Sequence, residues 1–194
     1  PQFERGDVAR VAEHAQTVAE ALLPYVEQGY DIVAMVPSCA LMLKFEWPLI
    51  LPDDARIKRL SEATFDVSEY VVDIARREGL APGLSALPGG IAVHIACHAR
   101  AQNMGQKAAE MLRLIPDTPI EVIERCSGHG GTFGVVEPTH KIAVKVGRPV
   151  FRTALGQARG HIASDCPLAA QHIVRQVEEL AAKDGKTAPA TAPE

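Results

Sequence analysis

The spacing of apolar residues predicts a long amphipathic helix near the start of the chain. Apolar residues recur there at intervals of three and four, the period of one helix face, at Val8, Val11, Ala12, Ala15, Val18, Ala19, Leu22 and Leu23. Asp7 is a suitable N-cap, and Gly29 can end the helix just after Glu27. The pattern therefore predicts a helix over residues 8–27.

Short apolar runs bounded by turn residues predict buried strands of the kind found in parallel sheets. These runs are residues 31–36, 91–96, 120–125 and 160–164. Helical patterns lie between them, over residues 39–47, 68–77, 100–115, 137–146, 149–157 and 167–183. Strands that alternate with helices predict an α/β fold with a mainly parallel sheet and right-handed helical crossovers.

A segment rich in glycine and proline, residues 79–90, is the best candidate for a boundary within the chain. The stretches on either side share an outline of helix, apolar strand and a cysteine that opens another helix. This outline predicts two pseudo-repeated cysteine-rich units, residues 1–82 and 83–183, the first of them truncated. Residues 184–194 are rich in Ala, Pro, Thr and Lys, and a disordered tail is expected there.

Composition places the chain among ordinary soluble globular proteins, with 47% hydrophobic and 23% charged residues. A net charge of −4 gives no basic footprint for nucleic acid or for an anionic membrane surface. No apolar run approaches the ~20 residues of a membrane span. We therefore expect a cytoplasmic protein, or one held at the inner face of the membrane through a partner. The chain starts at Pro1 without an initiator methionine, which suggests a fragment or a processed product.

The cysteines are the most informative chemical feature. There are four, too few for a disulfide scaffold, and Cys39, Cys97, Cys126 and Cys166 each follow a strand-like run. The carboxyl ends of parallel strands lie along one edge of a sheet, where ligand sites gather. Four soft ligands could meet there and hold a metal or an iron–sulfur centre. The alternative for any single cysteine is a small buried apolar residue.

The glycine-rich segment 126–134 permits a second interpretation. It follows a predicted strand, and its glycines would let the backbone approach a ligand closely. Such loops bind anions through backbone N–H groups, but the spacing here matches neither a P-loop nor a dinucleotide fingerprint. Close packing of the backbone against a cluster explains the glycines as well.

Three segments in order resemble the motifs of the second cysteine-rich repeat in the iron–sulfur subunit of anaerobic glycerol-3-phosphate dehydrogenase. They are residues 94–103, 124–134 and 163–169, while residues 36–44 resemble the close of the first repeat. The wider superfamily, with its Cys-Cys-Gly motifs, includes the cysteine-rich subunit of heterodisulfide reductase and lactate-utilisation iron–sulfur proteins. The resemblance covers nearly everything up to about residue 180. It implies an iron–sulfur electron-transfer protein of the cysteine-rich domain type.

The chain departs from that pattern at several positions. Ser127 stands at the second cysteine of Cys-Cys-Gly, Ala169 at the last cysteine of Cys-x-x-Cys, and Val36 at a cysteine of the first repeat. The ferredoxin-like region of family members is also missing. The second repeat thus keeps Cys97, Cys126 and Cys166.

A [4Fe–4S] cluster usually takes four thiolates, so this set leaves one position to fill. Cys39, His98 and His129 are the candidates for it. His94 points to the opposite face of its strand from Cys97, which argues against joint ligation by the two. His140 and His161 are expected to be structural.

The leading hypothesis is a subunit that passes electrons between a partner dehydrogenase, a flavoprotein, and a quinone or another carrier. It predicts an iron–sulfur cluster, of the [4Fe–4S] type, bound by Cys97, Cys126 and Cys166. Two alternatives are a non-redox module that holds zinc or no metal, and a thiol-dependent reductase with a reactive cysteine at a helix start.

Overall fold

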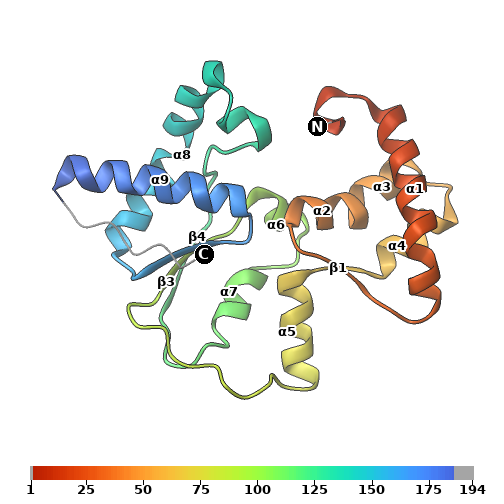
Figure 1. Ribbon diagram of the computed structural model, residues 1–194, viewed down its shortest axis with the longest axis horizontal. Coiled ribbons are helices and arrows are strands. Elements are labelled where there is room, and N and C mark those ends of the chain that lie inside the picture. Colours follow the sequence, from red (N-terminus) through yellow and green to blue (C-terminus); the bar gives the residue numbers. More distant parts are fainter. Residues whose placement is uncertain (1, 186–194) are drawn as a thin grey trace. The chain divides into compact units, whose positions relative to one another are not determined.

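The computed structural model describes residues 2–185 and divides into two compact units (Figure 1). Unit 1 ends at Tyr70 and unit 2 begins at Val71, so the division falls within helix α5 (Val67–Arg77). The repeat boundary expected at residue 82 lies downstream of this point. Of the expected tail, residues 186–194 lie outside the described residues, and Asp184 ends the last helix.

Unit 1 is a small helical layer with a two-stranded parallel sheet. Its elements are the 3-10 turn η1 (Phe3–Arg5), α1 (Val8–Glu27), β1 (Ile32–Ala34), α2 (Pro37–Leu41), the π-helix η2 (Met42–Glu46), α3 (Trp47–Ile50), α4 (Ala55–Glu62), β2 (Thr64–Asp66) and the start of α5. Strand β1 pairs with β2, with Ile32 opposite Thr64. The core lies between α1 and α4, where Ala15, Ala19 and Leu60 are fully buried.

Helix α1 confirms the prediction from apolar spacing. The Asp7 carboxylate accepts a hydrogen bond from the backbone N–H of Arg10 at 3.3 Å, which caps the helix start. Gly29 follows the C-cap with φ of 90°, a left-handed conformation that glycine adopts without steric cost. The helix has the expected bounds because the capping signals at its two ends agree with its apolar face.

Two expectations for unit 1 were wrong. The helix near Cys39 begins earlier, at Pro37, because the first helical position needs no N–H donor. It also continues past Pro48, because η2 ends at Glu46 and α3 begins at Trp47, which places Pro48 in the first turn of α3, where a proline is tolerated. Strand β2 was not among the predicted strands, because its three residues are too few to give a recognisable alternation.

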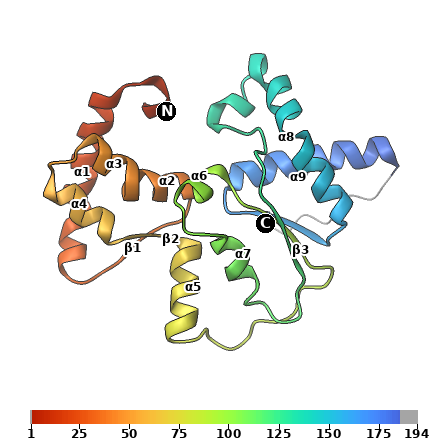
Figure 2. The ribbon, with the colours of Figure 1, turned by 180° about the vertical axis from the view of Figure 1, so that it is seen from behind.

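Unit 2 is a three-stranded parallel sheet with helices on both faces (Figure 2). Its elements are the rest of α5, β3 (Ile91–His94), α6 (Cys97–Ala101), α7 (Lys107–Leu112), β4 (Ile120–Ile123), the 3-10 turn η3 (Gly131–Gly134), α8 (Glu137–Gln157), β5 (His161–Ser164) and α9 (Pro167–Asp184). The strand order is β4-β3-β5, with β3 buried in the centre. The predicted α/β class and parallel pairing are confirmed.

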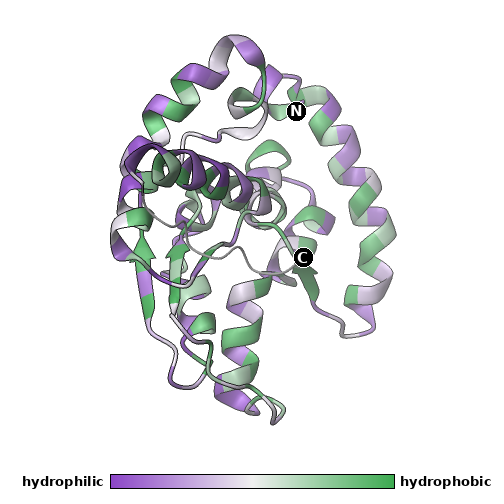
Figure 3. Ribbon diagram, turned by 60° about the vertical axis from the view of Figure 1, so that its left-hand side comes forward, coloured by the Kyte–Doolittle hydropathy of each residue, from purple (hydrophilic) through white to green (hydrophobic). Residues whose placement is uncertain are grey.

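Alternation along β3 divides the core of unit 2 into two clusters. Ala92 packs with Phe151 of α8 and Ile173 of α9 on one face of the sheet. Ile91 and Val93 belong to the other cluster, which contains residues of α6 and α7. Apolar and polar residues are interspersed along the helices (Figure 3), as expected of helices that bury one face and expose the other.

Two helix predictions for unit 2 need correction. The helix expected over residues 100–115 is interrupted between α6 and α7, where Asn103 and Gly105 adopt left-handed conformations. The two helices expected over residues 137–157 are one, α8, which contains Pro149 in its interior. The burial of Val150 and Phe151 in the core offsets the hydrogen bond that the proline cannot make.

Within residues 2–185, no helix has the length and apolar character needed to cross a membrane.

Candidate functional site

Three cysteines of unit 2 lie at the carboxyl ends of three adjacent parallel strands. Cys97 begins α6 just after β3, Cys126 follows β4, and Cys166 is the N-cap residue of α9 after β5. Because the strands are neighbours and run in the same direction, the three residues share one edge of the sheet. Cys97 and Cys126 are exposed and Cys166 is partly exposed, so none of them is a buried packing residue.

His94, the last residue of the central strand, links the ends of both neighbouring strands. Its Nε2 lies 2.9 Å from the backbone oxygen of Arg125, and its Nδ1 lies 3.0 Å from Ser164 Oγ. A carbonyl oxygen can only accept, so Nε2 carries the hydrogen and Nδ1 accepts from the Ser164 hydroxyl. This assignment fixes one neutral tautomer of the imidazole.

Two further hydrogen bonds complete the network at the strand ends. The backbone N–H of Ala96 donates to Asp165 Oδ1 at 2.9 Å, and the N–H of Cys166 donates to Ser164 Oγ at 3.3 Å. Each of the three cysteines is therefore preceded by a residue that is hydrogen bonded to the end of another strand. These residues are Ala96, Arg125 and Asp165. The network holds the backbone that carries the three thiols in a defined arrangement.

The burial of His94 favours the neutral form of its imidazole. Its side chain is 1% exposed. Burial lowers the pKa of His94, and the nearby Arg100 guanidinium lowers that pKa further. Both ring nitrogens of His94 are engaged in hydrogen bonds, so this residue positions the strand ends.

Nitrogen donors lie close to two of the thiols. Arg100 Nη2 is 3.3 Å from Cys97 Sγ, one helical turn away along α6. The backbone N–H of Gly128 lies 3.4 Å from Cys126 Sγ. Such donors would also be available to the sulfur atoms of a bound cluster.

The other predicted ligands Cys39 and His98 come from helices. Cys39 belongs to α2 of unit 1, where it is exposed, and His98 is exposed on α6 of unit 2. Across residues 2–185, no three His, Cys, Asp or Glu side chains are arranged closely enough to hold a metal ion. The donor set fits an iron–sulfur cluster in its chemistry and in its place at the sheet edge, but its thiols do not form a closed ligand set.

The glycine-rich loop packs against helix α8. Gly128 has φ of 79°, and a Cβ atom added to it would run into the backbone oxygen of Ala143. A Cβ atom added to Gly147 would likewise run into the backbone oxygen of Ser127. These glycines permit close approach between two parts of the chain, which holds Cys126 and the following residues against α8.

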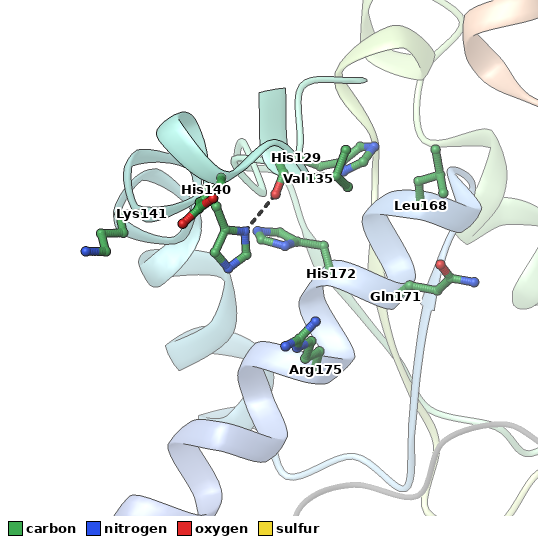
Figure 4. A pocket seen from close by; sticks show the side chains of 10 residues that line it. His129, Val135, His140, Lys141, Leu168, Gln171, His172 and Arg175 are labelled. Carbon is green, nitrogen blue, oxygen red and sulfur yellow. Dashed lines mark hydrogen bonds between the residues drawn. The ribbon is translucent and has the colours of Figure 1, made fainter. Parts of the chain in front are cut away.

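Sequence reasoning missed a cavity of about 580 Å³ in unit 2 between the glycine-rich loop, α8 and α9 (Figure 4). Three of its lining residues are His129, His140 and His172, and the ring centroid of His172 lies 6.2 Å from each of the other two. Burial lowers the pKa of His129 and His172, and the neighbouring imidazoles lower that of His172 further. The three residues come from separate segments, so no spacing in the sequence indicated the cluster.

The chain is similar to several proteins named Lactate utilization protein A. It is 30% identical over 144 residues to the one from Anoxybacillus flavithermus, which covers 70% of this chain and 57% of that protein. It is 29% identical over 162 residues to the one from Geobacillus kaustophilus, covering 78% and 61%, and 27% identical over 143 residues to the one from Bacillus pumilus, covering 70% and 57%. The chain thus spans a little over half the length of these relatives. No family model matches it.

Proposed function

We propose that this chain is an iron–sulfur electron-transfer component of lactate utilisation. It would pass electrons between a partner dehydrogenase, a flavoprotein, and a quinone or another carrier. The observation that carries the proposal is the placement of three accessible thiols at the carboxyl ends of adjacent strands, joined through His94. The similarity to proteins named for lactate utilisation supports the metabolic context.

Cys97, Cys126 and Cys166 would supply the thiolate ligands. A bound cluster supplies one-electron transfer, with a potential that depends on hydrogen bonds to its sulfurs and on exposure to solvent. Arg100 and the N–H of Gly128 are placed to donate to sulfur atoms there. The protein's own contribution is to fix the backbone at the strand ends and to provide these donors.

The fourth ligand is proposed from among Cys39, His98 and His129. His98 directly follows Cys97 and is exposed, so its imidazole is free to turn toward a cluster bound by Cys97. His129 is 7% exposed and lies beside His172 at the cavity, which makes it the weaker of the two histidine candidates. Cys39 has the favoured donor chemistry for such a cluster, since thiolate is its usual ligand.

Purification without oxygen tests the proposal directly. Iron and acid-labile sulfide should be present in equal amounts, and a broad visible absorption should bleach when dithionite is added. The chain should also yield a paramagnetic signal after one-electron reduction.

A colourless protein that still lacks iron after reconstitution with iron and sulfide would reject the proposal. Stoichiometric zinc in that protein would favour the non-redox metal-binding module. Cysteine-dependent reduction of a disulfide substrate by the metal-free protein would favour the thiol reductase.

A further inference from the structure

We propose that the cavity between the glycine-rich loop, α8 and α9 binds a small organic anion that carries an apolar portion. We call it the histidine cavity, and its lining includes His129, Lys141, Leu168, His172 and Arg175. Its volume of about 580 Å³ falls in the range of sites for small molecules. Cys97, Cys126 and Cys166 are not among its lining residues, but the candidate ligand His129 is. The tests below therefore use Lys141, Arg175 and Leu168, which are not candidate cluster ligands.

Fixed charge in the histidine cavity favours an anion. Lys141 and Arg175 line it, and Glu137 is the one carboxylate among the lining residues. Within the described part of the chain, Lys141 makes no ion pair. Arg175 pairs with Glu179 at 3.5 Å, but both side chains are largely exposed, so this pair is weak and can be given up.

His172 contributes an unsatisfied polar atom. Its Nε2 is buried and has no hydrogen-bond partner among residues 2–185. Phe151 packs against the His172 ring, with 5.4 Å between centroids, and limits the orientations of the imidazole. A buried nitrogen without a partner is costly, so a ligand oxygen that bonded to it would recover that free energy. Gln171 places a neutral amide in the same lining (Figure 4).

The remaining lining explains why the anion should be organic. Val135 and Leu168 both line the histidine cavity, yet they are 68% and 54% exposed. Burial of these side chains against an apolar group would add favourable free energy that an inorganic ion cannot supply. A carboxylate on a short hydrocarbon chain matches both the cationic and the apolar parts of the lining.

Calorimetric titration of the purified 194-residue chain tests the proposal with hexanoate as probe. Hexanoate should bind at least about tenfold more tightly than hexanamide, which has the same chain without the charge. Acetate and inorganic phosphate should bind more weakly than hexanoate, since they lack the apolar portion. Phosphate binding tighter than that of hexanoate would overturn the organic character of the ligand.

Two matched lysines on α8 give the control. Lys141→Gln should weaken hexanoate binding about tenfold, as should Arg175→Gln. Lys145→Gln removes an exposed cation one turn along the same helix that does not line the cavity, and should leave the affinity unchanged. Equal affinities for the Lys141 and Lys145 variants, or no measurable hexanoate binding by the unaltered chain, would reject the proposal.

Leu168→Gln tests the apolar contact separately. It should weaken hexanoate binding while leaving that of acetate unchanged, because acetate does not reach an apolar wall. A Leu168 variant that binds hexanoate as tightly as the unaltered chain would contradict the assigned apolar contact.

Discussion

His94 and Ser164 lie opposite each other on adjacent parallel strands, and their side chains are hydrogen bonded at 3.0 Å. The same imidazole donates to the backbone oxygen of Arg125 at the end of the other neighbouring strand. A single buried side chain therefore connects all three strand ends that carry cysteines. The placement of the candidate ligands depends on this residue, although it is not one of them.

Replacement of His94 by leucine should destabilise unit 2 by about 1–3 kcal/mol. The change removes two hydrogen bonds made by a buried imidazole, and each such bond contributes ~0.5–1.5 kcal/mol. Urea unfolding followed by circular dichroism measures the loss. His98→Leu is the matched control, because His98 is exposed and close in sequence, and it should change the free energy of unfolding little. Equal losses in the two variants would contradict the bridging role.

Stability should fall as the solution becomes mildly acidic. Burial lowers the pKa values of His94, His129 and His172 below the ordinary 6.5. The unfolded chain then binds protons that the folded chain does not, so the free energy of unfolding decreases as the pH falls below 6.5. This loss ends once the pH lies below the lowered pKa values of the folded state.

Urea midpoints measured between about pH 7.5 and about pH 5.5 will show this dependence. His94→Gln should reduce the slope, since it removes one of the three groups. The opposite trend, a rise in stability toward pH 5.5, would show that these imidazoles gain protons more readily in the folded protein.

Gly128→Ala should be strongly destabilising, by more than about 1 kcal/mol. The new Cβ meets the backbone of Ala143, and the positive φ is unfavourable for alanine. Gly156→Ala in α8 is a control of opposite sign, because nothing lies within 4 Å of its added Cβ. It should stabilise the protein by up to ~1 kcal/mol through helix propensity. Thermal unfolding of both variants measures the contrast, and destabilisation of similar size in the two would contradict the packing described for the loop.

Cysteine-to-serine replacements should separate the ligands. Cys97→Ser, Cys126→Ser and Cys166→Ser should each lower the iron content of anaerobically purified protein by more than about half, since thiolates are the usual ligands of such clusters. Cys39→Ser lowers it as well only if Cys39 is the fourth ligand. Retention of full iron in all three unit 2 variants, with folding verified by circular dichroism, would exclude this ligand set.

Much of the fold follows from local patterns. The helix from Val8 to Glu27 was predictable because its apolar period, its capping Asp7 and the terminating Gly29 all indicate the same bounds. The strands of unit 2 were predictable because their apolar runs end at turn residues. The breaks around Asn103 and the continuity of α8 through Pro149 were not, because tertiary packing outweighs the local preference of these residues.

The sequence by itself determined which thiols follow strands, and therefore that Cys97, Cys126 and Cys166 would share one edge of a parallel sheet. Only the tertiary structure decided how that edge is held, because His94 meets Ser164 and Arg125 through pairing of strands far apart in the chain. It also decided that His129, His140 and His172 would line one cavity. Periodicity within one segment specifies the direction of a side chain, but contacts between segments depend on how the sheet and helices pack.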